Sequence, residues 1–275
     1  MLGARPVETI VSIITVSLNA SMTIRDTLDS VRRQDATFGI EHICVDGGSV
    51  DGTREIIEEA ATLNSRVVFL FERDQGLFDA MNKGLRLARG RYVLFLNADD
   101  FLIGSASVAG AFSHVDLAAK SPDMVMGDVI MGHLDRFGIW RMRRVPRWLP
   151  RFPGLGAHPP HQGNFINRQL LLRTGGFDAD QRLAADTTQF YRLVHEFNAT
   201  MVVSRTIVSF MRMGGASNKN LASFGQGNAE AFRFLRRYKS PPAASLTVAV
   251  KVLQKLWEYR VGHLRKTTFV GSSSS

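Results

Sequence analysis

Short apolar runs alternate with segments of helical periodicity along the first half of the chain. Apolar, β-branched runs bounded by polar turns are typical of buried strands in a parallel sheet. Between them, apolar residues recur every three or four positions, as on the buried face of a helix. We expect helices that begin near Ser21, Asp51 and Leu77, the last with Gly90 as its C-terminal cap. The predicted strands cover residues 11–18, 40–45, 67–71, 92–96 and 124–131.

Strands that alternate with helices indicate right-handed βαβ units around a mainly parallel sheet, and therefore an α/β fold. Five prolines between residues 146 and 160 then indicate a loop-rich segment over 146–162. After this segment the pattern again predicts regular secondary structure: a strand over 164–167, a helix after Asp186, an extended run over 201–211 and helices over 223–239 and 245–266. We expect one α/β domain over residues 1–222 and a basic helical extension over 223–275 with a disordered tail.

The net positive charge of the chain suggests that the protein binds an anionic partner. With 275 residues, the chain is long enough for one large domain or two small ones, and its net charge is +9. Basic side chains mixed with aromatic ones suit an anionic membrane surface or a nucleic acid, and a solvated basic face is the simplest alternative. One cluster interleaves Phe137, Trp140, Trp148 and Phe152 with Arg136, Arg141, Arg143, Arg144, Arg147 and Arg151, and the other contains Arg233, Arg236, Arg237, Lys239, Lys251, Lys255, Arg260, Arg265 and Lys266.

Cysteine content and hydropathy suggest the cellular compartment. Cys44 is the sole cysteine, so an intramolecular disulfide and a cysteine-based metal cluster are excluded. Its apolar neighbours predict a buried, inert thiol. The apolar stretch 10–18 is about half as long as the ~20 residues of a membrane span, and it lacks the features of a signal peptide. We therefore expect a cytoplasmic protein.

Four acidic and glycine-rich segments carry the candidate chemistry. Each follows an apolar run, so their carboxylates are expected at one edge of the sheet, where open α/β proteins bind ligands. Carboxylates in that position suit a divalent cation and a diphosphate. The segments cover residues 45–53, 74–84, 96–100 and 184–186.

Single residues in these segments have both a functional and a structural interpretation. Asp99 and Asp100 suit Mg²⁺ or Mn²⁺, and they also suit a turn at the end of a strand. Asp46, followed by two glycines, can accept hydrogen bonds from a base or a ribose, while Ser49 or Asp51 caps the next helix. Asp186 at a helix start stays ionised, as a general base requires, or it only caps that helix.

Other motifs narrow the field. No G-x-G-x-x-G follows the first strand, and no P-loop, H-E-x-x-H or G-x-S-x-G sequence occurs. Any phosphate would therefore be held through a cation rather than by a glycine-rich loop. His158 and His161 flank a Pro-Pro pair, where they could bind a metal, or His161 could face a substrate.

Taken in this order, the segments resemble family 2 glycosyltransferases, and the similarity runs over residues 12–220. The match is carried by Val45–Thr53, Asp74–Gly84 and Leu96–Asp100, together with Met213–Ser217. Within the family, the chain is most similar to enzymes of bacterial exopolysaccharide and lipopolysaccharide assembly, such as those that build colanic acid. The resemblance implies a GT-A type nucleotide-sugar-binding fold for residues 1–222, with a mainly parallel central sheet followed by C-terminal helices.

The resemblance also implies a role for each matching residue. Asn97-Ala98-Asp99 takes the place of the family's D-x-D signature, with Asp99 as the metal ligand. Asp186 matches the catalytic base, although Asp178 and Asp180 lie close by in sequence. The first acid of D-x-D is Asn97 here, so metal affinity rests mainly on Asp99. The remaining donor-binding residues are Thr15, Val16, Ser17 and Asn19 around the nucleotide, Asp46, Gly48 and Ser49 at the base, and Asp79 and Asn82 near the ribose and sugar.

The implied reaction is an inverting single displacement. Asp186 accepts the proton of an acceptor hydroxyl, while Mn²⁺ or Mg²⁺ stabilises the departing nucleoside diphosphate. A UDP-sugar is the favoured donor, and a polyprenyl-diphosphate-linked saccharide is the expected acceptor, with His161 and Trp140 as possible contacts. The basic segment 136–156 and the C-terminal helices would place the enzyme peripherally on the inner face of the cytoplasmic membrane.

Three alternatives remain at this level. A nucleotidyltransferase that makes sugar nucleotides usually has a glycine-rich basic loop after the first strand, but Ser17–Ser21 occupies that place here. A nucleic-acid binder would agree with the pI of about 10.2, yet acids at its binding face would repel phosphate. A transferase that binds nucleotide without turnover is suggested by Asn97.

Overall fold

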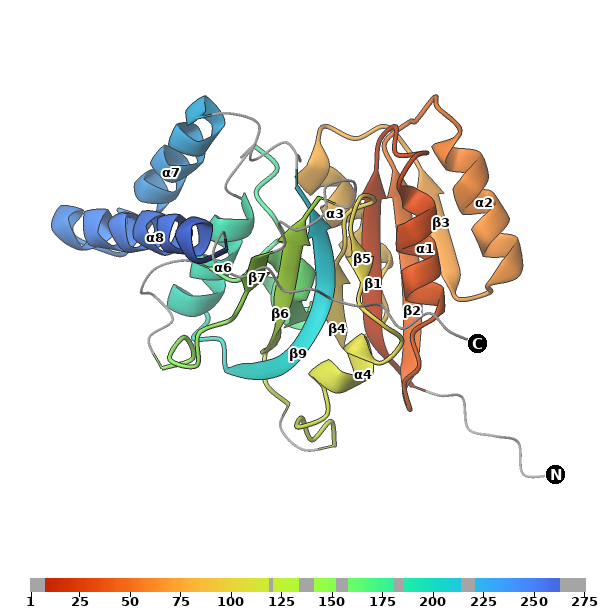
Figure 1. The fold of residues 1–275 in the computed structure, drawn as a ribbon, viewed down its shortest axis with the longest axis horizontal. Coiled ribbons are helices and arrows are strands. Elements are labelled where there is room, and N and C mark those ends of the chain that lie inside the picture. The colour runs from red at the N-terminus through yellow and green to blue at the C-terminus, as the bar shows by residue number, and fades with distance from the viewer. Residues whose placement is uncertain are drawn as a thin grey trace.

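The computed structural model describes residues 8–118, 121–133, 141–151, 158–180, 185–213 and 221–262. Within these residues the chain forms one nine-stranded sheet with helices on both of its faces (Figure 1). The strands are β1 (Thr9–Ser17), β2 (Gly39–Asp46), β3 (Val67–Phe71), β4 (Tyr92–Phe95), β5 (Phe101–Leu102), β6 (Met124–Gly132), β7 (Arg141–Arg143), β8 (Asn164–Asn167) and β9 (Met201–Arg212). The helices are α1 (Ile24–Arg32), α2 (Thr53–Leu63), α3 (Leu77–Leu87), α4 (Ser107–Ala111), α5 (Arg168–Arg173), α6 (Ala185–His195), α7 (Leu221–Leu235), α8 (Pro241–Gly262) and the 3₁₀ turn η1 (His161–Gly163).

The order of strands across the sheet is β3-β2-β1-β4-β8-β6-β9-β5, and β7 pairs with β6. The first four strands are parallel, and the register pairs Ser17 with Asp46 at the ends of β1 and β2. β8 runs antiparallel between β4 and β6, whereas β9 runs parallel to β6. The expected α/β fold with a mainly parallel sheet is thus confirmed, and β8 is an antiparallel insertion that an apolar pattern cannot distinguish from a parallel strand.

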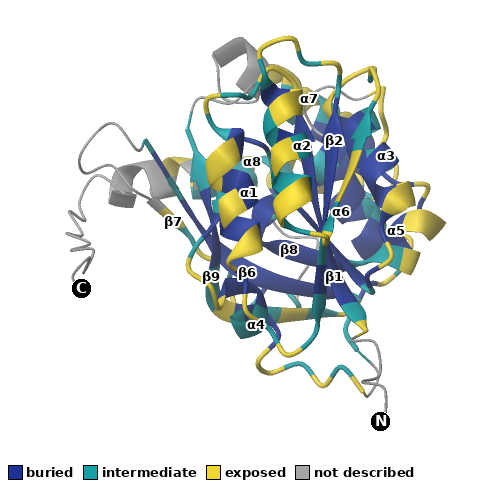
Figure 2. Ribbon diagram, turned by 90° about the vertical axis from the view of Figure 1, so that its right-hand side faces the viewer, coloured by how far each residue is buried: buried dark blue, intermediate teal, exposed yellow. Residues whose placement is uncertain are grey.

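Alternate residues of the strands pack against helices on opposite faces. Ile14 of β1 belongs to a core cluster with α3, α5, α6 and α7. Its neighbour Ile13 belongs to a second cluster with α1 and α4, and a third cluster joins α1, α2 and Cys44. The central strands are therefore buried on both sides (Figure 2). The prediction of a buried Cys44 thiol is confirmed, and burial raises the pKa of that thiol to about 12.

Two predicted helix caps are wrong, although the helices themselves are confirmed. Thr23, not Ser21, precedes the first turn of α1, and the Ser21 backbone N–H donates instead to Asp51 Oδ2 at 3.0 Å. Helix α3 ends at Leu87 with Ala88 as its C-cap rather than Gly90. Gly90 is small for another reason, since a Cβ there would lie 2.6 Å from the backbone nitrogen of Ser12.

The sequence pattern missed five short elements, which are β5, α4, β7, η1 and α5. Each is too short for a periodicity to show. The helices of the predicted extension were found correctly, and they join the main core, since Phe234 and Leu235 of α7 and Ala244 of α8 are buried in it. The domain boundary at residue 222 stays a prediction, and the predicted disordered tail lies beyond the described residues.

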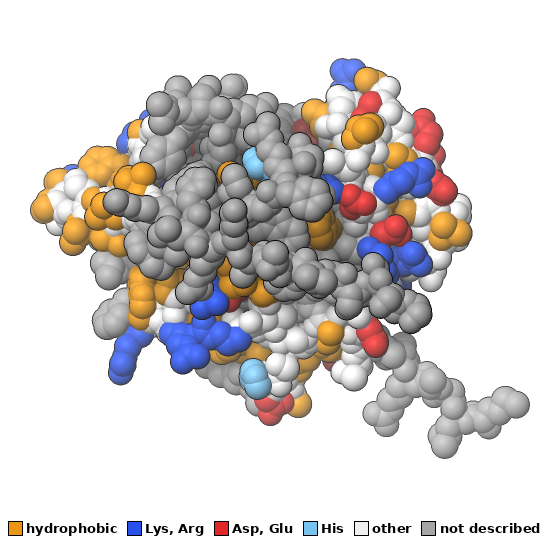
Figure 3. Space-filling model, in the orientation of Figure 1, with side chains coloured by type: hydrophobic (Ala, Val, Ile, Leu, Met, Phe, Trp, Pro, Cys, Tyr) orange, Lys and Arg blue, Asp and Glu red, His pale blue; other side chains and the backbone are white. Residues whose placement is uncertain are grey.

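None of the described helices combines the length and the hydropathy needed to cross a membrane. Helices α7 and α8 lie at one end of the molecule (Figure 1). Hydrophobic side chains are visible on the surface at that end (Figure 3), and Leu246, Leu253 and Leu256 of α8 are among the exposed large hydrophobic residues.

Candidate active site

The loops after β1 and β2 are tied together by Asp46. Its Oδ2 accepts hydrogen bonds from Ser17 Oγ (2.8 Å) and Ser49 Oγ (2.6 Å), and its Oδ1 accepts from the backbone N–H groups of Gly48 (3.0 Å) and Ser49 (2.8 Å). A carboxylate has about four acceptor sites, so this loop uses all of them. Asp46 is buried, and Gly48 has a φ of 99°, which favours glycine. Its predicted contact with a base would therefore need one serine hydroxyl to turn away.

Asn19 makes a second connection between the same two loops. Its side-chain oxygen accepts from Val50 N (3.0 Å), and its own N–H donates to Ser49 Oγ (2.7 Å). Asn19 has a φ of 52°, a conformation that asparagine tolerates better than most residues. Asn19 is exposed and Ser49 is half-buried, and their predicted contacts with a nucleotide stay predictions.

Thr15 lies inside the sheet rather than at its edge. Its Oγ1 is 2.9 Å from Nε2 of His42, and both residues are buried. Val16 and Ser17 are buried as well, the latter held by Asp46. A donor contact from this strand would have to come from its loop, so the predicted roles of these three residues stay predictions.

Helix α3 contributes the next two predicted residues. Asp79 Oδ2 accepts from Gln75 N (3.0 Å) and lies 3.6 Å from Lys83 Nζ. Asn82 makes a reciprocal pair with the backbone of Phe177, donating to its oxygen and accepting from its nitrogen, both at 2.8 Å. Asn82 therefore holds the turn that precedes the Asp186 segment, and its predicted approach to a ribose or sugar is untested.

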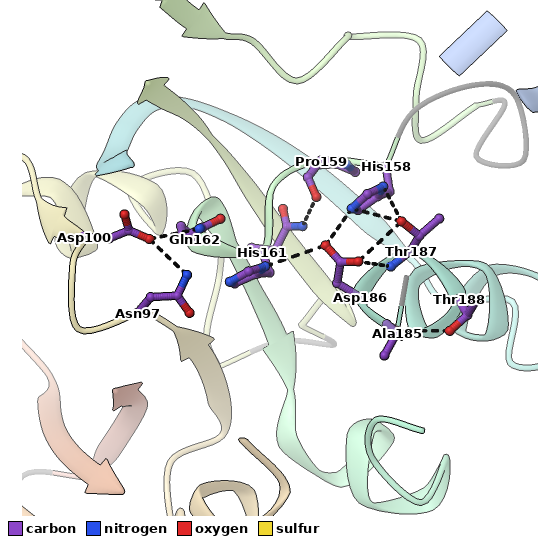
Figure 4. Close-up of polar contacts among 11 residues, drawn as sticks. Asn97, Asp100, His158, Pro159, His161, Gln162, Ala185, Asp186, Thr187 and Thr188 are labelled. Atoms are coloured by element: carbon purple, nitrogen blue, oxygen red, sulfur yellow. Dashed lines mark hydrogen bonds and ion pairs between the residues drawn. The ribbon is translucent and has the colours of Figure 1, made fainter. Parts of the chain in front are cut away.

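Asp100 connects three elements at the end of β4 (Figure 4). Its Oδ2 accepts from Gln162 Nε2 (2.9 Å) and Asn97 Nδ2 (3.2 Å), and its Oδ1 accepts from Arg212 N (2.9 Å). Burial, and then the neighbouring Asp99, raise the pKa of Asp100 to about 7. Burial also raises the pKa of Asp99, which is less enclosed. Asp100 thus has a structural role, because its carboxylate is buried and hydrogen-bonded. The carboxylate of Asp99 is the more accessible of the two.

The surroundings of Asp99 fit a hard cation that shares its coordination with a substrate. Asn97 Oδ1 and His161 Nε2 are buried without a hydrogen-bond partner among the described residues. Arg212 contacts Asp99 through the backbone oxygen (2.8 Å), so the carboxylate remains available. The described part of the chain contains no group of three His, Cys, Asp or Glu residues that could hold a metal. Mg²⁺ and Mn²⁺ fit such a place, because they take one or two carboxylates plus water and phosphate oxygens.

Asp186 begins α6 and is enclosed by two histidines. Its Oδ2 lies 3.0 Å from His158 Nε2 and 3.8 Å from His161 Nδ1, while its Oδ1 accepts from Thr187 N (2.6 Å). Thr187 Oγ1 lies 3.1 Å from His158 Nδ1, so the ring is held at both nitrogens. Burial would raise the pKa of Asp186, but the two histidines outweigh it and hold that pKa well below its usual range.

The charge state of the His158–Asp186 pair follows from burial. Burial lowers the pKa of His158, although Asp186 opposes the shift. We therefore assign a neutral His158 that donates its Nε2–H to an ionised Asp186 and accepts from Thr187 at Nδ1. An ionised carboxylate held in a fixed orientation can act as a general base near neutral pH.

Comparison with known proteins supports a single family. Residues 12–179 match the family model described as glycosyl transferase family 2. The chain belongs to this family. A PGL/p-HBAD biosynthesis glycosyltransferase of Mycobacterium bovis (strain BCG / Pasteur 1173P2) is 33% identical over 221 residues, which cover 75% of this chain and 78% of that protein. TuaG of Bacillus subtilis (strain 168), named for teichuronic acid biosynthesis, is 44% identical over 92 residues, 33% of this chain and 36% of that protein.

Solved structures of glycosyltransferases show the same fold. S. aureus TarS 1–349 in complex with UDP-GlcNAc matches with a TM-score of 0.59 and 17% identity, over 88% of this chain and 71% of that one. The mannosyltransferase PcManGT from Pyrobaculum calidifontis in complex with GDP-Man and Mn²⁺ matches with a TM-score of 0.61 and 19% identity, over 94% of this chain and 74% of that one. The GT-A type fold expected from the sequence is thus confirmed.

For this family 2 glycosyltransferase, the structure also changes how the two histidines are interpreted. The sequence suggested His158 and His161 as a possible metal pair, but both face the Asp186 carboxylate. Asp178 and Asp180 are exposed, with Asp180 N donating to Asp178 Oδ1 at 3.2 Å, so neither shares the enclosed position of Asp186. Trp140, the other possible acceptor contact, lies outside the described residues.

Sequence reasoning missed several residues around the site. Gln162 fixes Asp100, Thr187 fixes His158, and Arg212 crosses from β9 to Asp26 and to the backbone of Asp99. Gln162 follows the predicted residue His161, and Thr187 follows the predicted base Asp186, so their position next to a predicted residue is the only sign of them in the sequence. The sequence contains no such sign for Arg212, because Arg212 reaches the site from a strand far along the chain.

Proposed function

We propose that the chain is an inverting glycosyltransferase that moves a sugar from a nucleotide-sugar, with a UDP-sugar favoured, to a saccharide hydroxyl. The Asp186 carboxylate carries this proposal, because two histidines hold it ionised and oriented. His161 lies between that carboxylate and the segment 97–100, interacting with Asp186 on one side and with Asp99 and Asp100 on the other. Structural neighbours that bound UDP-GlcNAc or GDP-Man support a nucleotide-sugar donor.

The residues of the chain divide the reaction between two carboxylates. Asp186 accepts the proton of the acceptor hydroxyl as the oxygen attacks the anomeric carbon, and the bond to the nucleoside diphosphate breaks. His158 keeps the base oriented, and the unpartnered Nε2 of His161 is available to a substrate oxygen. Asp99 would hold Mn²⁺ or Mg²⁺, which when bound stabilises negative charge on a departing diphosphate.

The acceptor that we propose is a polyprenyl-diphosphate-linked saccharide at the inner face of the cytoplasmic membrane. The names of the similar proteins, which concern teichuronic acid and PGL/p-HBAD biosynthesis, support a cell-surface glycoconjugate. Arg144, Arg147 and Arg151 are exposed, and α8 exposes leucine side chains. Basic and apolar groups together favour peripheral binding to an anionic surface.

A thermal-shift panel tests donor binding. UDP, GDP and their sugar conjugates would be added with and without Mn²⁺, since a ligand of the folded state raises the melting temperature by mass action. We expect one nucleotide to stand out, its effect to depend on Mn²⁺, and Asp99→Asn to remove that dependence. A panel in which no nucleotide shifts the melting temperature would contradict the proposal.

Turnover separates an active transferase from one that only binds nucleotide, the alternative that Asn97 suggests. Asp186→Asn should keep the thermal shift and lose about 10²- to 10⁴-fold in donor turnover, the usual contribution of a general base. Asp178→Asn, at an exposed acid of the same region, is the matched control and should retain wild-type turnover. Equal turnover in Asp186→Asn and the control would remove Asp186 from catalysis.

A further inference from the structure

Strand β3 forms one edge of the sheet and is apolar over its whole length. It comes first in the order of the described strands, where β2 is its single neighbour. Its sequence is VVFLF, and Val68 and Phe69 are 40% and 42% exposed. Soluble proteins usually protect such an edge with a lysine, a proline or a bulge, because an open apolar edge pairs with other strands. Strand β3 contains none of these three.

The hydrogen bonds at the two ends of β3 show which of its backbone groups face outward. The carbonyl of Arg66 and the N–H of Glu72 both bond to β2, at 2.9 and 3.0 Å. Backbone groups alternate between the two sides of a strand, so those of Val67, Phe69 and Phe71 point away from β2. The Val67 N–H bonds back to the preceding turn (3.0 Å). The other outward groups of these three residues have no hydrogen-bond partner within the described part of the chain.

A second copy of β3 in antiparallel orientation can pair with these outward groups. Phe69 is the middle residue of the strand, so a two-fold axis beside it pairs the whole of β3 with its copy. The two Phe69 residues then exchange both of their N–H···O bonds, as in any hydrogen-bonded antiparallel pair. Each Phe71 N–H reaches the Val67 carbonyl of the other copy. The Val67 N–H, which the turn already uses, is left out of the pairing.

The same register brings apolar side chains together on both faces of the strand. On the face covered by α2, the Phe69 and Phe71 rings have centroids 5.0 Å apart, and Arg54 of α2 lies over the Phe71 ring. The two exposed Phe69 side chains become direct neighbours at the axis, which extends this row of rings. On the other face, Val68 lies opposite Leu70 of the second copy. Aromatic and β-branched pairs of this kind stabilise a sheet.

The charges that flank β3 are complementary only for an antiparallel copy. Arg66 precedes the strand, Glu72 follows it, and both are exposed. The register centred on Phe69 places each Arg66 opposite the Glu72 of the other copy, whereas a parallel copy would place like charges together. Glu72 Oε1 already pairs with Lys83 at 2.8 Å, and its Oε2 has no partner among the described groups. The flanking charges therefore favour a second copy of this chain as the occupant of the edge.

We propose that β3 is the interface of a two-fold homodimer in which two sheets join into one. The edge lies at the opposite end of the molecule from α7 and α8 (Figure 1), so pairing leaves those helices uncovered. A five-residue strand buries less area than a standard interface of ~1,600 Å², so the dimer is weak, with a Kd of about 1–100 µM. The proposal does not depend on the proposed function.

Sedimentation velocity of the full chain, at about 1 to 200 µM, tests the dimer. We expect a reversible shift from monomer to dimer as the concentration rises. Phe69→Lys places two ammonium groups side by side at the axis and should weaken dimerisation by about tenfold or more. Leu172→Lys is the matched control, because it adds the same charge at a 37% exposed leucine on α5. It should dimerise like the wild type.

Charge reversal tests the register and does not depend on the fold of Phe69→Lys. Arg66→Glu and Glu72→Arg each place like charges opposite one another at both ends of the interface, and each should weaken dimerisation by about three- to tenfold. The variant that carries both changes restores opposite charges and should dimerise like the wild type. Melting temperatures at low concentration identify any variant that loses its fold.

Three results would overturn the proposal. A wild-type chain that stays monomeric over the whole range has no such dimer. A dimer that Phe69→Lys and the charge reversals leave intact would lie on another surface. Charge reversals whose combination stays as weak as each alone would exclude the antiparallel copy and leave a strand of another protein as the occupant of the edge.

Discussion

His42 shows at the scale of one residue how the sheet controls ionisation. It lies buried beside Thr15, with its Nε2 atom 2.9 Å from Thr15 Oγ1. Burial, assisted by Arg66, lowers the pKa of His42 from 6.5 to about 3. The folded state therefore holds this ring neutral at pH values where the unfolded chain would protonate it.

We expect acid to destabilise the protein through His42. Because the folded pKa is depressed, the contribution to stability is complete above about pH 6.5 and is lost as the pH falls toward 3. Between pH 6.5 and 5 the free energy of unfolding should drop by about 2 kcal/mol from this group. Denaturant titrations at both pH values check this, and His42→Asn should show a smaller drop. A variant with the same drop as wild type would assign the acid sensitivity elsewhere.

His158 should determine the acid limb of activity. It is one of the two histidines that hold the pKa of Asp186 below its usual range, against the opposing effect of burial. In His158→Gln the base therefore becomes easier to protonate, so the acid limb of the kcat profile should move to higher pH. Donor KM should change little, because the donor side of the site is intact. A lower kcat with an unmoved acid limb would show that His158 has only a structural role.

At the scale of an element, the docking of α3 on the sheet depends on the absence of a side chain at Gly84. A Cβ at this position would lie 2.4 Å from Cγ2 of Ile14 in β1. The positions of Asp79 and Asn82 on α3, both predicted donor-binding residues, depend on that approach. The sequence pattern located α3 but gave no measure of its distance from β1.

A pair of glycine substitutions tests the docking of α3. Gly84→Ala overpacks the helix–sheet contact and should cost about 1–3 kcal/mol in the free energy of unfolding. Gly225→Ala, in the exposed part of α7 with nothing within 4 Å of its Cβ, should stabilise the fold by about 0.5–1 kcal/mol. Denaturant unfolding of the two variants should move in opposite directions, and a neutral Gly84→Ala would show that α3 can shift without cost.

At the scale of the whole molecule, a net charge of +9 accompanies an exposed basic loop and an apolar helix surface. Such a surface is attracted to anionic lipids over about one Debye length, so the attraction is weakened by salt.

We expect vesicles that contain anionic lipid to bind the protein at low salt and to release it at high salt. Replacing Arg144, Arg147 and Arg151 by Glu should weaken binding by about a hundredfold, since each basic residue contributes about 1 kcal/mol near such a surface. The control replaces the exposed Arg33, Arg86 and Arg89 by Glu, with the same change in net charge. Vesicle flotation measures both variants, and a protein that ignores anionic vesicles at low salt would refute membrane association.

The sequence was sufficient for features that depend on local patterns. Apolar periodicity located the long strands and helices, because burial of alternate or every third to fourth residue is visible in the chain itself. The spacing of the acidic segments was also sufficient to identify the family, and with it the GT-A type fold. The apolar pattern did not predict short strands such as β5 and β7, because a strand of two or three residues is too short to show a periodicity.

Only the tertiary structure decided which polar groups face one another. The direction of β8, the two histidines that enclose Asp186, and the hydrogen bonds from Gln162 and Arg212 to Asp100 all join segments distant in sequence. A pKa depends on burial and on neighbouring charges in space, and neither is encoded by spacing along the chain. The residue types were readable from the sequence, but the charge state and partner of each were set by packing.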